Sequence, residues 1–200
     1  MILILLAAAL TVDGEAGNSK FTAMFDAPLG EQISAVSSAV SCKLDYDKGT
    51  ASGTCTVPLT SISVDSEPTK TEHFQQWATN KKMEPKSCTI EATLAGLKAE
   101  PAELSEKPSQ LSGEAAFKVC GKARTGGGKE KLTGTAMKLP DGRIRIRVKV
   151  DKFDRDAYKI GPKYTEGWLS RVQQLAPVVA ESGTIDISIF AKPAETTGAK

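Results

Sequence analysis

The stretch RIRIRVKV, residues 143–150, decides the fold class of this 200-residue chain. It alternates basic and aliphatic residues without interruption. Because successive side chains of a β-strand point to opposite faces, this period of two predicts a strand with one buried and one solvated face. The expected inward residues are Ile144, Ile146 and Val148, and the expected outward residues are Arg143, Arg145, Arg147 and Lys149.

The same alternation recurs along most of the chain. It is found in the segments 21–25, 35–46, 51–59, 90–94, 115–117, 131–139 and 184–191. Turn sequences separate several of them, as at Asp47-Lys48-Gly49-Thr50 and Pro140-Asp141-Gly142. About eight short strands with regular turns favour an all-β, antiparallel sandwich or barrel.

Two segments depart from this period. A helix is expected over residues 165–176, with Thr165 as its cap. A shorter helix is expected to hold His73, Phe74 and Trp77. Neither provides a strand–helix–strand crossover system, so a parallel sheet is not expected.

The chain opens on an apolar run, Ile2 to Leu10, that contains Ala7-Ala8-Ala9. This pattern is typical of a signal-peptide core and cleavage site, although no Lys or Arg precedes it. It is too short to span a bilayer as a helix. The alternative is a buried N-terminal strand or helix. We interpret residues 1–16 as a signal peptide or its remnant, 19–192 as one folded domain and 193–200 as a polar tail, and we expect a periplasmic or secreted location.

Four cysteines, an even number, fit an oxidising compartment. A two-residue turn at Lys48-Gly49 would place Cys42 directly opposite Cys55. This is a non-hydrogen-bonded pair, with Cα atoms about 4.5 Å apart, a separation that a disulfide tolerates. We therefore predict a Cys42–Cys55 disulfide, with two buried free thiols as the alternative.

The second pair, Cys88 and Cys120, leaves two strand registers open. One places the cysteines opposite each other but sets Ile90 against Lys118. The other aligns the apolar positions but puts the cysteines on different faces. A bulge near Gly121 would reconcile the two and allow a second disulfide.

Composition gives little support for nucleic-acid binding, because 26 Lys and Arg nearly balance 24 Asp and Glu and aromatics make up only 6%. Catalysis has equally little support. His73 is the one histidine, no G-x-S-x-G motif accompanies it, and only Glu72 lies beside it as a metal ligand. The acidic segment 151–156 departs from the EF-hand loop, and residues 126–129 depart from the P-loop. We therefore expect no catalytic residue and no metal.

The inward positions leave two interpretations of the interior. Many are small, namely Ala23, Ala51, Gly53, Ala92, Ala115 and Ala136. An eight-stranded barrel has an interior that side chains just fill or that holds one small ligand. Small inward residues therefore indicate either a packed core or an apolar slot lined by the larger inward side chains.

The order of these segments resembles the YceI-like family of bacterial periplasmic proteins. The similar segments are 40–47 (the family's F-x-G-x-L-x-F-D strand), 57–62, His73-Phe74, 111–117, Asp154-Arg155 with Tyr158 (its N-R-x-D-F signature) and 184–190. Together they span about residues 19–192. The chain departs from the family at Lys118-Val119, at Ala157 and at Pro85, and the four cysteines are not part of the family pattern.

The resemblance implies a lipocalin-like, eight-stranded barrel with a tunnel for an isoprenoid tail, such as that of a polyprenyl lipid or a quinone. It implies tunnel-wall roles for Leu44, Tyr46, Phe117 and Tyr158, and a rim role for His73. With the inward positions and the helices, the lipid-binding candidates are Phe21, Phe25, Leu44, Tyr46, Ile90, Phe117, Ile144, Ile146, Tyr158, Trp168 and Ile187. We expect one elongated pocket lined by Phe21, Tyr46, Phe117 and Ile146.

The sequence thus predicts non-catalytic binding or transport of an isoprenoid-like lipid. An apolar lipid is the expected partner, with no cofactor beyond that lipid, no nucleic acid and no stable membrane span. One alternative is a periplasmic protein-interaction module with a packed core. Another is a hydrolase or isomerase at the barrel mouth, which would need an acid–base pair converging with His73.

Overall fold

The computed structural model describes residues 8–12, 18–80, 82–165 and 179–193. The strands are β1 (Ala8–Val12), β2 (Lys20–Asp26), β3 (Gln32–Ser37), β4 (Ser41–Asp47), β5 (Thr50–Pro58), β6 (Ser63–Val64), β7 (Thr89–Glu100), β8 (Ser109–Val119), β9 (Lys122–Ala123), β10 (Glu130–Lys138), β11 (Ile144–Asp154) and β12 (Ser182–Pro193). The α-helix is α1 (Pro68–Thr79), and the 3-10 turns are η1 (Pro28–Gly30), η2 (Leu59–Ser61), η3 (Pro85–Ser87), η4 (Asp156–Tyr158) and η5 (Pro162–Tyr164).

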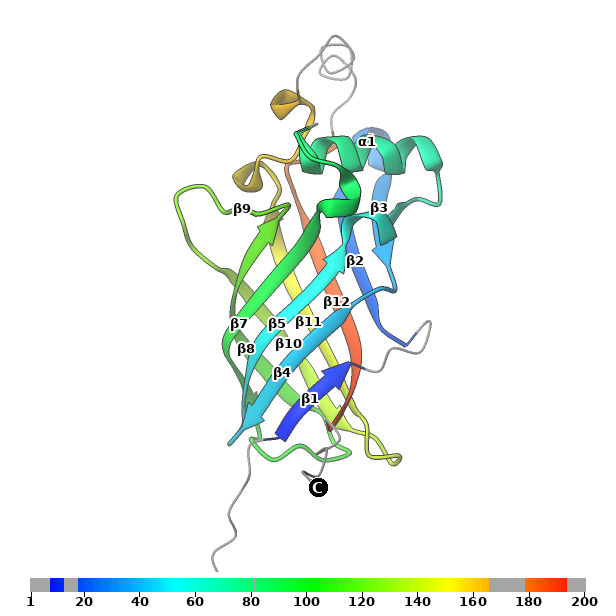
Figure 1. The fold of residues 1–200 in the computed structure, drawn as a ribbon. Coiled ribbons are helices and arrows are strands. Elements are labelled where there is room, and N and C mark those ends of the chain that lie inside the picture. Colours follow the sequence, from blue (N-terminus) through cyan, green and yellow to red (C-terminus); the bar gives the residue numbers. More distant parts are fainter. Residues whose placement is uncertain (1–7, 13–17, 81, 166–178, 194–200) are drawn as a thin grey trace, which may run out of the picture.

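The strands form a closed antiparallel barrel. Its ring runs β1-β4-β5-β7-β8-β10-β11-β12 and returns to β1, which makes eight strands in the described part of the chain. Beside β1, the first half of β12 pairs with β2, and β3 and β6 continue from there. Figure 1 shows the barrel with α1 lying across one end. The predicted all-β, eight-stranded barrel is confirmed.

Strand β1 lies within the segment that the sequence assigns to a signal peptide. It pairs with β4 and β12 and so closes the barrel, and the Leu10 side chain is buried in the core. The barrel therefore includes Ala8–Val12, rather than beginning at residue 19. Cleavage after Ala16 would remove this strand, whereas cleavage before Ala8 would keep it. The signal peptide stays a prediction.

The predicted single strand over 35–46 is wrong, because β3 and β4 are separated by residues 38–40. A local hydrogen bond explains the break: the Ser37 hydroxyl accepts from the Ala39 backbone N–H at 3.0 Å. Serine side chains offer the backbone such an alternative to strand pairing. The helix expected over 165–176 and the 194–200 part of the polar tail lie outside the described residues. Thr165, which is described, follows the turn η5.

The β4–β5 hairpin has the predicted register. Asp47 pairs with Thr50 across a two-residue turn in which Lys48 and Gly49 both have positive φ, of 46° and 82°. Both central residues of a type I′ turn need this conformation. Gly49 is also required sterically, since a Cβ there would lie 2.5 Å from the Cβ of Ala102.

Both cysteine pairs are bonded. Cys42 and Cys55 face each other as predicted, and Cys88 bonds Cys120 with Cα atoms 4.6 Å apart. Neither register considered for the second pair is correct, because Ile90 faces Val119. Cys120 lies just beyond β8 with φ of 50°, and its N–H donates to the Thr89 carbonyl at 2.9 Å. This local turn brings its sulfur to Cys88.

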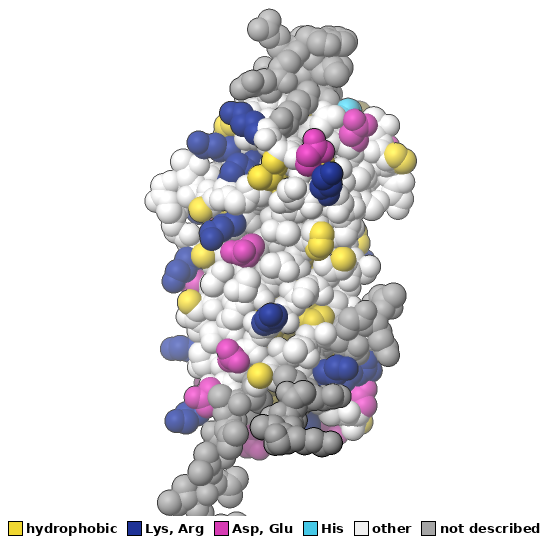
Figure 2. Space-filling view, viewed as in Figure 1, with side chains coloured by type: hydrophobic (Ala, Val, Ile, Leu, Met, Phe, Trp, Pro, Cys, Tyr) yellow, Lys and Arg dark blue, Asp and Glu magenta, His cyan; other side chains and the backbone are white. Residues whose placement is uncertain are grey.

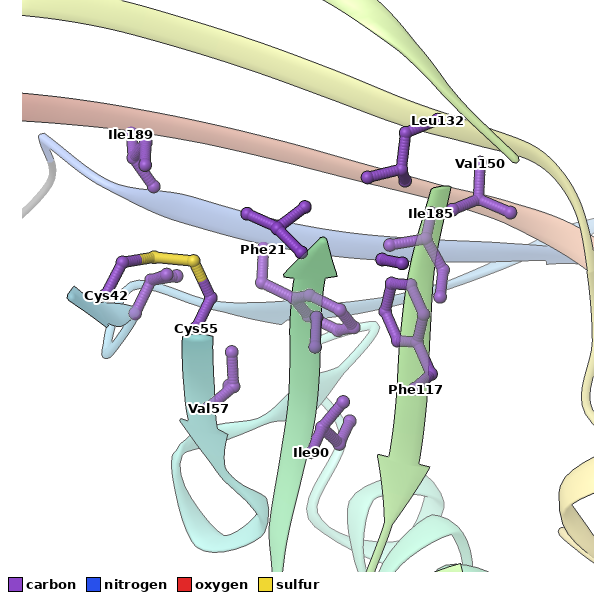
Figure 3. Close-up of a cluster of buried hydrophobic side chains, with 14 of the residues drawn as sticks. Phe21, Cys42, Cys55, Val57, Ile90, Phe117, Leu132, Val150, Ile185 and Ile189 are labelled. Carbon is purple, nitrogen blue, oxygen red and sulfur yellow. A yellow bond between two sulfur atoms is a disulfide. The ribbon is translucent and has the colours of Figure 1, made fainter. Parts of the chain in front are cut away.

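Strand β11 has the orientation predicted from its alternation. Ile146 and Val150 are buried, whereas the Arg143 and Arg145 guanidinium groups lie over the Phe190 ring. Acidic and basic side chains are interspersed on the face seen in Figure 2. Figure 3 shows how aliphatic and aromatic side chains fill the barrel interior around Phe21 and Phe117. No helix in the described ranges is long and apolar enough to cross a membrane.

Candidate ligand-binding cavity

The barrel encloses an apolar cavity of about 230 Å³ beneath α1, which we call the mouth cavity. Its walls come from β2 and β3, with Phe21, Phe25 and Ala35, from β7, with Ile90, and from β12, with Ile185. Alternation places every second side chain of a strand inside, which explains why residues two apart share this wall. The cavity is of the kind that binds an apolar ligand.

Helix α1 covers the mouth cavity with one face. Its contributions are Lys70, His73, Phe74 and Trp77, at the i, i+3, i+4, i+7 spacing of a single helical face. Pro68 begins the helix, where its missing N–H costs nothing, and Asn80 ends it in the left-handed conformation. The sequence predicted this helix and His73 at the rim, and the structure places both at the mouth.

The two ends of α1 are tied to the barrel. Near its start, the Thr71 hydroxyl accepts from the Val64 N–H at 2.9 Å, and the Lys70 ammonium pairs with Asp65 at 3.0 Å and Glu67 at 2.9 Å. These contacts hold the first turn of the helix against β6. Since β6 pairs with β3, the helix is tied to the wall of the mouth cavity.

At the other end, the Lys122 ammonium donates to the Ala78 carbonyl at 2.5 Å, and to Asn80 Oδ1 and the Lys159 carbonyl at 3.3 Å each. A cation there also interacts favourably with the negative end of the helix dipole. Burial, together with the smaller effect of the Lys159 charge, lowers the pKa of Lys122 to about 8. Lys122 thus holds the C-terminal end of α1 over the cavity.

Arg155 fixes the part of the cavity wall that follows the end of β11. It is 5% exposed and donates to three backbone carbonyls: Nε to Ala180 at 3.0 Å, Nη1 to Ile160 at 2.6 Å and Nη2 to Val179 at 2.6 Å. Burial lowers the pKa of its guanidinium. The guanidinium fits because Gly161 has no side chain: a Cβ at this position would lie 2.4 Å from Nη1.

Behind the mouth cavity, aromatic rings form a column. The Phe117 ring meets Phe153 edge-on at 5.9 Å between centroids, and Phe153 stacks on Tyr158 at 4.8 Å. The Tyr158 hydroxyl donates to Glu130 at 2.8 Å, and Arg124 pairs with the same carboxylate at 2.8 Å. Burial, with the hydrogen bond to Glu130, raises the pKa of Tyr158. This network fixes the positions of the rings.

Deeper in the barrel is a second apolar space of about 40 Å³, which we call the inner space. Tyr46, Phe117 and Ile146 line it. Leu104, from the connection between β7 and β8, lines it at the end of the barrel opposite α1 (Figure 1). The Tyr46 hydroxyl donates to the Ala102 carbonyl in that connection.

The expected single pocket lined by Phe21, Tyr46, Phe117 and Ile146 is therefore divided into two. Of the lipid-binding candidates and the rim candidate, Phe21, Phe25, Ile90 and His73 line the mouth cavity, and Leu44, Tyr46, Phe117, Ile146 and Ile187 line the inner space. Ile144 and Tyr158 line neither. Tyr158 faces away because its hydroxyl bonds Glu130. Trp168 lies outside the described residues.

Several wall residues were not among the sequence candidates. Phe74 and Trp77 share the helical face of His73, so their spacing carries a signal that could have identified them. Arg155, Ile160 and Val179 carry no such signal, because irregular segments bring them to the wall.

The ionisable residues among the described wall of the mouth cavity are Lys70, His73 and Arg155, all of them basic types. A carboxylate that could form an acid–base pair with His73 is not among these wall residues. No group of three or more His, Cys, Asp or Glu suited to a metal occurs among the residues that the structure describes. The chemistry available at this site is the burial of apolar surface, with basic groups at the rim.

No family model matches the chain, and no curated protein matches it. Among solved structures, its fold is similar to that of a polyisoprenoid binding domain from Saccharophagus degradans implicated in plant cell wall breakdown. The TM-score is 0.69 at 12% sequence identity, over 94% of this chain and 99% of that chain. This likeness shows that the two share a fold, and it agrees with the barrel that the family resemblance implies.

Proposed function

We propose that this protein binds an isoprenoid-like lipid in its barrel and carries or stores it without chemical change. The observation that carries the proposal is the mouth cavity, an apolar space of about 230 Å³ at one end of the barrel. Burying an apolar tail there is favourable by about 25 cal/mol for each Å² removed from water. The solved domain of the same fold is itself described as polyisoprenoid-binding.

A binding role without catalysis fits the wall of the cavity. General acid–base catalysis needs a positioned acid or base within hydrogen-bond reach of the reacting atoms. His73 has no carboxylate beside it in the described wall, and the Lys70 charge is already paired with Asp65 and Glu67. No cofactor besides the lipid is part of the proposal.

An oxidising location belongs to the same proposal. Both pairs of cysteines form disulfides, which persist outside the reducing cytosol. The periplasm and the cell exterior are such compartments. A protein that carries an apolar lipid there would also need a site that shields the lipid from water. Periplasmic and cytosolic fractions of a cell that makes the protein, probed with an antibody, would test the location.

Filling the mouth cavity tests the binding function. Ala35 is buried on β3 and faces the cavity, so Ala35→Trp would fill it with an indole. Ala95 is exposed on the outer face of β7, so Ala95→Trp is the matched control. Native mass spectrometry and lipid extraction of the purified proteins should find lipid in the wild type and the control, and little in Ala35→Trp.

Two results would count against the proposal. Lipid that co-purifies unchanged with a folded Ala35→Trp protein would place binding elsewhere. A wild-type protein that carries no lipid and takes up none from vesicles would favour a protein-interaction module.

A further inference from the structure

The barrel interior is divided across its axis. The two apolar spaces share no wall residue: Ile90, Val119 and Ile185 line the mouth cavity, and their inward neighbours two positions further along the strands, including Ala92 and Phe117, line the inner space. A layer of side chains thus separates the two. Figure 3 shows Phe21, Ile90 and Phe117 pointing into the same region of the core.

Phe117 is the central member of this layer. It lines the inner space, and its ring meets Phe153, which lines the mouth cavity. Its register partner on the neighbouring strand β7 is Ala92, whose side chain is only a methyl group. Phe117 is 3% exposed, and its contact with Phe153 joins the wall of the inner space to the wall of the mouth cavity.

The Phe117 ring is held rather than free to swing aside. Phe153 is fixed by its stack on Tyr158, and Tyr158 is fixed by its hydrogen bond to Glu130. Glu130 is buried and paired with Arg124. Edge-on and offset-stacked ring pairs of this kind are favourable beyond the area that they bury. The column therefore opposes a rotation that would join the two spaces.

The volumes give the consequence for a ligand. An apolar cavity of about 150 Å³ holds benzene, so by proportion a cavity of about 230 Å³ holds roughly nine or ten carbon atoms. That is about two isoprene units. By the same proportion the inner space, at about 40 Å³, holds roughly one or two carbon atoms and adds no further unit.

We infer that Phe117 sets the length of the bound tail: this protein selects short isoprenoids whose tail ends at the Phe117 ring, with the head at the α1 mouth. The inference rests on the proposed function and deepens it. Longer tails are excluded because their ends would have to displace the ring. Phe153 and Tyr158 act as positioning residues for Phe117.

The test compares geraniol, farnesol and solanesol as added ligands, with affinity measured by competition against a fluorescent fatty-acid probe. The wild type should bind geraniol, which has two isoprene units, at least about tenfold more tightly than farnesol, which has three, or solanesol, which has nine. Phe117→Ala, which joins the two spaces, should remove the preference for geraniol over farnesol by raising the affinity for farnesol. Leu132→Ala enlarges the inner space without opening the layer, and should keep the wild-type preference.

Each outcome supports or overturns the inference. If Phe117→Ala does not fold, Phe117→Leu opens the same layer with a smaller loss of stability. It should change the ligand preference in the same direction. Equal affinity of the wild type for geraniol and farnesol would overturn the role of Phe117 and leave lipid binding intact. A ligand preference that is unchanged in both Phe117 variants would also overturn the role of Phe117. A wild type that binds none of the three alcohols and carries no lipid would instead remove the proposed function.

Discussion

Cys42 lies directly opposite Cys55 on the paired strands β4 and β5, with the two Cα atoms 4.0 Å apart and the sulfurs bonded. The bond closes a loop with a sequence separation of 13 residues, and loops of this size restrict the unfolded chain modestly. We expect the double variant Cys42→Ala/Cys55→Ala to lose about 2–3 kcal/mol in free energy of unfolding, measured by denaturant titration.

The bond itself can be mapped directly. Peptides from the unreduced, exported protein should contain a linked pair that spans the Lys48-Gly49 turn. Recovery of alkylated Cys42 or Cys55 as a free thiol would show that the strands pair without the bridge.

The sequence could predict this pair because a two-residue turn fixes a hairpin register. The same logic failed for Cys88 and Cys120, whose connection passes through a turn with Cys120 at positive φ, which alternation does not reveal. The break between β3 and β4 was missed for a similar reason, since it depends on one serine hydroxyl. The alternation of apolar and polar residues predicts regular strands. Irregular turns depend on single contacts, which this alternation does not reveal.

The candidate site was predicted in part. Inward positions such as Phe21 and Ile90 follow from alternation, and both line the mouth cavity. The division of the interior does not follow, because alternation assigns Phe117 to the inside but says nothing of where its ring lies along the barrel axis. That position depends on Tyr158 and Glu130, which bond across separate elements.

Gly161 should be intolerant of a side chain. It has φ of 151°, and a Cβ there would meet Arg155 Nη1 at 2.4 Å. Gly161→Ala should therefore lose more stability than the roughly 1–3 kcal/mol of backbone strain alone, because the guanidinium must also leave the Ile160 carbonyl. Gly142→Ala is the control, since Gly142 has φ of 85° but open space around it. Equal losses in thermal or denaturant unfolding would show that Arg155 does not depend on this glycine.

Tyr158 and Tyr164 make similar hydrogen bonds in different surroundings, so the same substitution at both positions can be compared. Both donate hydroxyl hydrogen bonds to carboxylates, Tyr158 to buried Glu130 and Tyr164 to half-buried Asp156. Leaving a buried acceptor short of a donor is costly, so Tyr158→Phe should lose about 1–2 kcal/mol and Tyr164→Phe less than about 1 kcal/mol in free energy of unfolding. Denaturant titration of both variants provides the comparison. A larger loss in Tyr164→Phe would mean that the column behind Phe117 is not held by this bond.

Lys122 should give a pH-dependent contribution to stability. Burial lowers its pKa in the folded protein from 10.5 to about 8. Between these two values the unfolded chain binds more protons than the folded one, so stability rises with pH across that window. Compared with Lys122→Met, the wild type should become relatively more stable from pH 8 to pH 10.5, and the difference should be flat below pH 7.

The measurement is the free energy of unfolding of both proteins at several pH values. Taking the difference removes the contributions of titratable groups that do not interact with Lys122. A difference that stays constant through the window would show that folding does not lower the pKa of Lys122, and a difference that falls would show that the hydrogen bonds at the end of α1 raise it.

Trp77 offers a direct optical test of where the ligand binds. It lies on the face of α1 that covers the mouth cavity, and the chain has only one other tryptophan, Trp168. In a Trp168→Phe protein the emission therefore reports on Trp77 alone. Geraniol in the cavity would replace water near the indole by hydrocarbon, so we expect a saturable shift of the emission to shorter wavelength. A shift that persists in Trp77→Phe and is absent from Trp168→Phe would place the ligand away from α1.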